Sequence, residues 1–111
     1  MIYKETAWNI IKANAKKALI TKMVYHSIVE GRAYSIIAVE EKKITIKRVS
    51  GGNDETLSEG EVIKAIDVIN AAGGKMKRRT LISPTVAKET AFVLFHPEIT
   101  WDEDGENIEV L

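Results

Sequence analysis

The sequence predicts an α+β fold in a single domain that spans residues 1–111. Apolar residues recur at helical spacing near the N-terminus, two short runs then alternate as strands do, and a helix with clear start and stop signals follows. A chain of this length is near the commonest domain size and can bury one ordinary core. We expect an N-terminal helix, a three-stranded antiparallel sheet, a capped helix, then a helix or strand, and a C-terminal hairpin.

The first helix is predicted over residues 2–20, because no Gly or Pro interrupts this segment and its alanines favour a helix. Its apolar residues fall along one stripe, which we expect to face the core. This stripe consists of Trp8, Ile11, Ala15, Ala18 and Leu19.

Three strands are predicted next, over Met23–Val29, Tyr34–Val39 and Lys43–Val49, from their β-branched and aromatic residues. The connections between them are too short for crossover helices, so the sheet is expected to be antiparallel. In the third strand the side chains alternate between the two faces. One face takes Ile44, Ile46 and Arg48, and the other takes Thr45, Lys47 and Val49.

A second helix follows the loop at residues 50–54 and has a complete set of end signals. Ser58 and Glu61 have the spacing of a capping box, and Leu57 and Val62 that of a hydrophobic staple. Gly73-Gly74 supplies residues that adopt the left-handed conformation at a helix end.

The rest of the chain is predicted as a basic connector over residues 75–79, an element over Thr85–Phe95, and a hairpin. Ser83-Pro84 resembles a helix start, but Thr90–Phe95 also reads as a buried strand, so both alternatives stay open. The hairpin pairs Ile99–Trp101 with Ile108–Leu111 around the turn residues Asp104-Gly105.

Composition excludes several classes of function. The chain contains no cysteine, which excludes disulfides, thiolate metal sites and cysteine nucleophiles. No apolar run approaches the roughly 18 residues of a membrane-spanning helix, and the N-terminus lacks a signal-peptide pattern. We therefore expect a cytoplasmic protein without a membrane partner. His26 and His96 lack a recognised ligand spacing, and we predict neither a metal nor a cofactor.

The charges are strongly polarised along the sequence, although the net charge is zero. Residues 1–88 contain 16 Lys/Arg and 9 Asp/Glu, a surplus of +7, whereas residues 89–111 contain 7 acids and no Lys or Arg. Such a pattern is typical of a nucleic-acid-binding body with an acidic tail, and it also arises when opposite charges meet in the fold.

Two basic clusters make binding of DNA or RNA the first hypothesis for a small, non-catalytic module. We expect them to form one phosphate-binding patch if the strand and the connector meet, with Tyr25 and Tyr34 nearby as rings that can stack on bases. The candidate site consists of Lys47, Arg48, Lys75, Lys77, Arg78 and Arg79.

A protein-interaction or regulatory role is the alternative hypothesis. Its candidate surface is the region of Trp101, where an exposed indole beside an acidic rim would anchor a protein partner or a second copy of the chain. The acidic tail could also imitate a nucleic acid or cover the basic body.

A third hypothesis comes from Glu40-Glu41-Lys42-Lys43, which contains the Glu-x-Lys pattern twice. With the predicted order of elements, this pattern resembles the PD-(D/E)xK nuclease superfamily. The resemblance implies a magnesium-dependent nuclease in which Glu30 and Glu41 bind the metal and Lys43 activates water. The chain lacks the Pro-Asp of that family, and its triplet falls at a turn.

Overall fold

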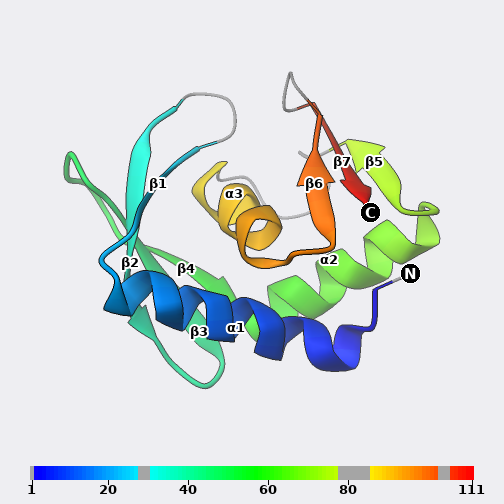
Figure 1. The fold of residues 1–111 in the computed structure, drawn as a ribbon, viewed down its shortest axis with the longest axis horizontal. Helices are drawn as coiled ribbons and strands as arrows, with labels where there is room; N and C mark the ends of the chain where they lie inside the picture. Colours follow the sequence, from blue (N-terminus) through cyan, green and yellow to red (C-terminus); the bar gives the residue numbers. More distant parts are fainter. Residues whose placement is uncertain (1, 28–30, 78–85, 103–105) are drawn as a thin grey trace.

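The computed structural model describes residues 2–27, 31–77, 86–102 and 106–111. It confirms an α+β domain, in which three helices pack with one four-stranded and one three-stranded sheet (Figure 1). Arg78, Arg79, Glu30, the helix start at Ser83-Pro84 and the hairpin turn at Asp104-Gly105 lie outside the described residues. None of the helices in the described ranges combines the length and the hydrophobicity of a transmembrane segment.

The larger sheet is antiparallel, with its strands in sequence order. Its strands are β1 Val24–His26, β2 Ala33–Val39, β3 Lys43–Arg48 and β4 Glu55–Ser58. The prediction of three strands was incomplete, because β4 pairs with β3 immediately before the second helix. The strand predicted over Met23–Val29 is shorter in the structure, and residues 28–30 are not described.

Helix α1, Lys4–Ile20, is the first element of the chain and runs roughly along the long axis of the structure (Figure 1). Its buried residues follow the predicted stripe, with Ala7 in addition and Leu19 only partly buried. Two of its side chains bind backbone carbonyls of other elements: Trp8 Nε1 donates to the oxygen of Glu41 at 2.8 Å, and Asn14 Nδ2 donates to that of Phe95 at 2.7 Å.

Helix α2, Glu59–Ala71, begins with the predicted capping box. Ser58 Oγ accepts from the backbone N–H of Glu61 at 3.2 Å, and the Glu61 carboxylate accepts from the backbone N–H of Ser58 at 3.0 Å. Leu57 and Val62 are both fully buried beside it. The helix is followed by Gly73 and Gly74, whose φ angles of 78° and 92° are the expected left-handed stop.

The Glu61 carboxylate also joins α2 to α3, Val86–Phe95, because Lys88 Nζ lies 2.7 Å from its Oε2. Burial alone raises the pKa of Glu61, but the hydrogen bonds from Lys88 and Ser58 outweigh burial and hold that pKa below its ordinary value. Thr90–Phe95, which the sequence allowed as either a helix or a strand, is helical in the structure.

The smaller sheet has the order β5-β7-β6, with β5 Lys75–Lys77, β6 Ile99–Trp101 and β7 Asn107–Val110. Pairing of β6 with β7 confirms the predicted hairpin strands. The prediction of a basic connector is wrong for residues 75–77, because these residues form a strand that pairs with β7.

Replacing Ser58 by alanine should lower the free energy of unfolding by about 1 kcal/mol, because it removes the acceptor for the Glu61 N–H. Urea denaturation of the two proteins measures this difference. Ser35→Ala is the matched control, because Ser35 is a strand serine away from any helix start, and should change stability by less than about 0.5 kcal/mol. Equal losses in the two variants would show that the cap contributes nothing.

Candidate nucleic-acid interface

The four-stranded sheet has one buried and one uncovered face. Along β3, Ile44 and Ile46 are buried at 0% and 1% exposure, whereas Lys43 and Lys47 are exposed and Thr45 is half-buried. We call the outward-pointing side chains the open face. By strand pairing and alternation it consists of Val24, His26, Ala33, Ser35, Ala38, Lys43, Thr45, Lys47, Thr56 and Ser58, with Ile37 at a bulge, Val49 just beyond β3 and Asp54 just before β4.

Within the four strands, the open face carries cations but no carboxylate; the register of β3 and β4 continues to Asp54, just before β4, opposite Lys47. Glu55 is the one acid within the four strands, and it pairs with Ile46, which belongs to the buried face. Lys47 is exposed and has no ion-pair partner among the residues that the structure describes. Lys43 lies 3.6 Å from the Glu40 carboxylate, but both side chains are about half exposed, and such pairs are weak.

Hydroxyl side chains share the open face with Lys47. Ser35 is the direct cross-strand neighbour of Lys47 on β2, and Thr45 pairs with Thr56 of β4 two residues further along β3. Ammonium and hydroxyl groups are the donors with which proteins commonly bind phosphate oxygens. The open face therefore has the chemistry of a phosphate-contacting surface.

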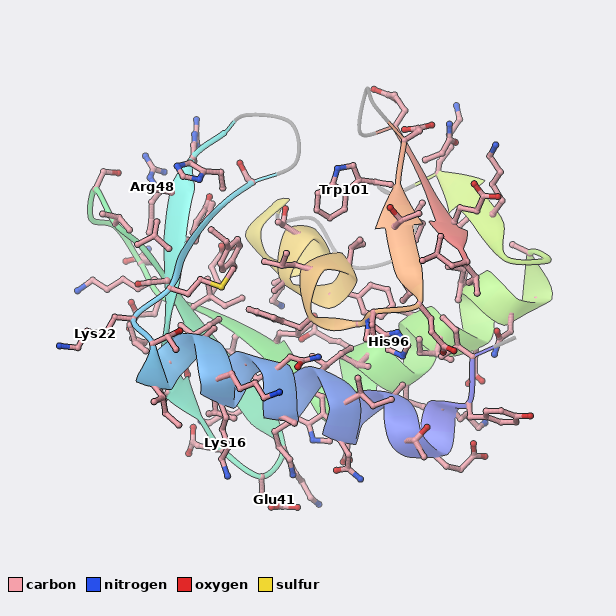
Figure 2. The ribbon with its side chains drawn as sticks, viewed as in Figure 1. Lys16, Lys22, Glu41, Arg48, His96 and Trp101 are labelled. Carbon is pink, nitrogen blue, oxygen red and sulfur yellow. The ribbon has the colours of Figure 1, made fainter. Side chains whose placement is uncertain are left out.

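The structure does not bring the two predicted basic clusters together. Figures 1 and 2 show β5 at one end of the long axis and Arg48 at the other. Lys47 and Arg48 also point to opposite faces of β3; the Arg48 side chain is partly buried, and its Nε donates to Ser50 Oγ at 3.1 Å. Of the four predicted residues that the structure describes, only Lys47 lies on the open face.

One of the two β5 lysines has an acidic cross-strand neighbour. Lys75 lies directly opposite Glu109 in the β5–β7 pair, and Lys77 lies opposite Asn107. Cross-strand pairs of opposite charge interact favourably at the distance that this register imposes. The acidic tail is thus partly a strand of the smaller sheet, with Ile108 fully buried, and it offsets charge on β5.

Tyr25 and Tyr34 are not available for base stacking, which corrects the sequence interpretation. They are 4% and 7% exposed, and their rings stack on each other with centroids 5.9 Å apart. Phe95 contacts Tyr25 edge-on at 6.0 Å. Burial, helped by Tyr34 and Glu55, raises the pKa of Tyr25 and keeps its phenol neutral.

The residues of the nuclease hypothesis do not form a site in the described part of the chain. Glu41 lies in the turn between β2 and β3 and pairs with Lys12 at 3.3 Å, while Lys43 pairs with Glu40. Gly31, which follows Glu30, lies beyond the other end of β2, roughly 20 Å away at about 3.3 Å per residue. Among the described residues, no group of three His, Asp or Glu side chains is arranged to hold a metal ion.

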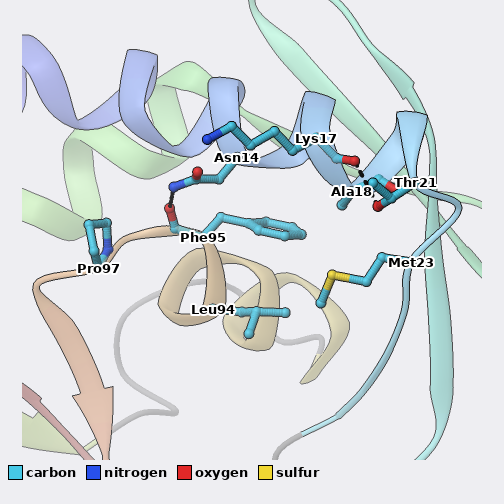
Figure 3. Close-up of a pocket in the computed structure, with 8 residues that line it drawn as sticks. All are labelled: Asn14, Lys17, Ala18, Thr21, Met23, Leu94, Phe95 and Pro97. Atoms are coloured by element: carbon cyan, nitrogen blue, oxygen red, sulfur yellow. Dashed lines mark hydrogen bonds between the residues drawn. The ribbon is translucent and has the colours of Figure 1, made fainter.

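Two surface pockets flank the end of α3. One, of about 330 Å³, is lined by α1 residues, Met23 and the α3 end, and Figure 3 shows Lys17 and Asn14 at its edge with Leu94 and Met23 across it. The other, of about 310 Å³, includes Leu94, Leu111 and the half-buried Trp101. Trp101 packs against the core, so it is only partly exposed to a partner.

His96 is buried just beyond α3, and this burial was not predicted from the sequence. Its ring is 1% exposed, Nδ1 accepts from the backbone N–H of Glu98 at 3.2 Å, and Nε2 has no hydrogen-bond partner among the described atoms. Burial lowers the pKa of His96, while the Glu98 carboxylate opposes this shift. The ring is therefore neutral in the folded protein at pH 7.

Comparison of the chain with protein-family models, curated proteins and solved structures gives no significant match.

The free energy of unfolding should decrease as the pH falls below 6.5, the ordinary His value, because the unfolded chain then binds a proton at residue 96 that the folded chain resists. The loss should continue down to the lowered pKa of the folded state. In His96→Asn the contribution of residue 96 to this slope should disappear, because asparagine does not titrate. The fold should be retained, since Asn Oδ1 can still accept from the Glu98 N–H. Urea titrations at several pH values measure the slope, with His26→Gln, at an exposed histidine, as control. A slope lost equally in both variants would contradict the assignment to His96.

Proposed function

We propose that the protein is a small non-catalytic module that binds nucleic acid by contacting phosphates on the open face. The observation that supports it most directly is the exposed Lys47, which has no ion pair within the described residues and lies on a face to which the four strands contribute no carboxylate. Phosphate contacts by lysine supply most of the affinity of non-specific nucleic-acid binding.

The binding mode follows from the groups on the open face. Lys47 and Lys43 supply charge, and the hydroxyls of Ser35, Thr45 and Thr56 supply hydrogen-bond donors. The nearby aromatic rings point into the core, so binding by stacking is not part of the mechanism. We therefore propose a contact that is independent of base sequence and strongly weakened by salt.

Contact with a protein partner through the Trp101 region is the second candidate. It is supported by the pocket that Trp101 shares with Leu94 and the largely exposed Leu111. A Trp101→Ser variant separates the candidates, because it should leave nucleic-acid binding unchanged if the open face is the interface.

Lys47→Gln should weaken binding of a fluorescein-labelled oligonucleotide and lower the slope of log K against log salt by about one, because one phosphate contact is lost. Fluorescence anisotropy across a salt series measures both quantities. The matched controls are Lys64→Gln on α2, which removes an exposed lysine away from the sheet, and Lys75→Gln on β5.

Both control variants should retain the slope of the unsubstituted protein. Absence of binding even at low salt would refute the proposed function. A reduction of the slope by Lys75→Gln but not by Lys47→Gln would move the interface to the smaller sheet.

A further inference from the structure

The open face places three kinds of side chain in one row across three strands. Strand pairing aligns Val24 of β1 with Ser35 of β2, and Ser35 with Lys47 of β3. With strands about 4.8 Å apart, the row leads from an apolar side chain through a hydroxyl to an ammonium over roughly 10 Å. Base, sugar and phosphate follow one another in the same order across a nucleotide.

The exposed apolar side chains of this face extend the pattern. Val24, Ile37 and Val49 are 48%, 41% and 56% exposed, although Val and Ile at strand positions are usually buried. Next to lysines, they form an apolar surface beside a phosphate-binding cation. Phosphate contacts alone do not account for the exposure of these three apolar side chains.

Duplex DNA does not match this surface. In a duplex the bases are paired inside and are reached only through a groove about 12 Å wide, which admits a helix or a two-stranded ribbon. The four strands span roughly 14 Å between the backbones of the edge strands alone, before side chains are added. Against a duplex, the exposed valines would face charged phosphates rather than bases.

We propose that the open face binds single-stranded nucleic acid, with the phosphates at Lys47 and the unpaired bases on Val24 and Val49. This inference rests on the proposed function and narrows its substrate to unpaired nucleotides. Because valine offers apolar contact without base-edge hydrogen bonds, the face accepts any base.

Three fluorescein-labelled ligands test the proposal by anisotropy: an oligothymidylate of about twelve nucleotides, a duplex of the same length, and a strand of abasic sugar-phosphate units. The oligothymidylate should bind roughly tenfold more tightly than either of the others, because only it offers bases to the valines. Val24→Ser should weaken oligothymidylate binding about fourfold, leave the abasic strand unaffected and keep the salt slope. The control Ile20→Ser changes a residue 79% exposed on α1, away from the open face, and should alter none of these values.

Duplex binding as tight as single-strand binding, or equal affinity for the abasic strand and the oligothymidylate, would overturn this inference and leave the proposed function standing. Failure of all three ligands to bind at low salt would refute both. A Val24→Ser effect of the same size on the abasic strand would also overturn the inference, because it would show that the valine supports the surface rather than the bases.

Discussion

The two-residue period of the four-stranded sheet is the constraint on which the other features depend. Ile44, Ile46 and Leu57 are almost completely buried on one face, and this burial fixes the register of β3 and β4. A slip of one residue would bring Lys43 and Lys47 into the core at a high desolvation cost. The same register directs Tyr25 and Tyr34 inward, and Ser35 and Lys47 outward.

Polar side chains fix the helices relative to this sheet. Trp8 and Asn14 of α1 bind backbone carbonyls in the β2–β3 turn and at the end of α3, and Asn70 of α2 exchanges two hydrogen bonds with the backbone of Ile2. The Glu61–Lys88 pair joins α2 to α3. The bonds of Trp8, Asn14 and Asn70 satisfy backbone groups that would otherwise be costly to bury, and buried residues of all three helices belong to the one core.

Local sequence signals predicted the elements whose residues carry their own pattern. The capping box at Ser58, the α1 stripe and the alternation of β3 were readable because each depends on neighbours a few residues apart. Strand β4 was missed because its four residues resemble a polar approach to the helix, and only pairing with β3 makes them a strand. The strand at Lys75–Lys77 was missed for the same reason, since its partner lies about thirty residues later in the chain.

The candidate site was only partly predictable. Alternation already separated Lys47 from Arg48, yet their adjacency in sequence suggested a shared patch. The distance between β3 and β5 and the position of Glu109 opposite Lys75 depend on the tertiary arrangement, which no local pattern contains. The burial of His96 could not be predicted, because Pro97 and Glu98 beside it are typical of an exposed turn.

The most direct test of the open face as the interface is an amide chemical-shift titration of the ¹⁵N-labelled protein with an oligothymidylate. We expect the largest shifts at Val24, Ser35 and Lys47, which form one row across β1, β2 and β3. Shifts concentrated at Lys75–Lys77 and β7, or no shifts at low salt, would contradict the assignment.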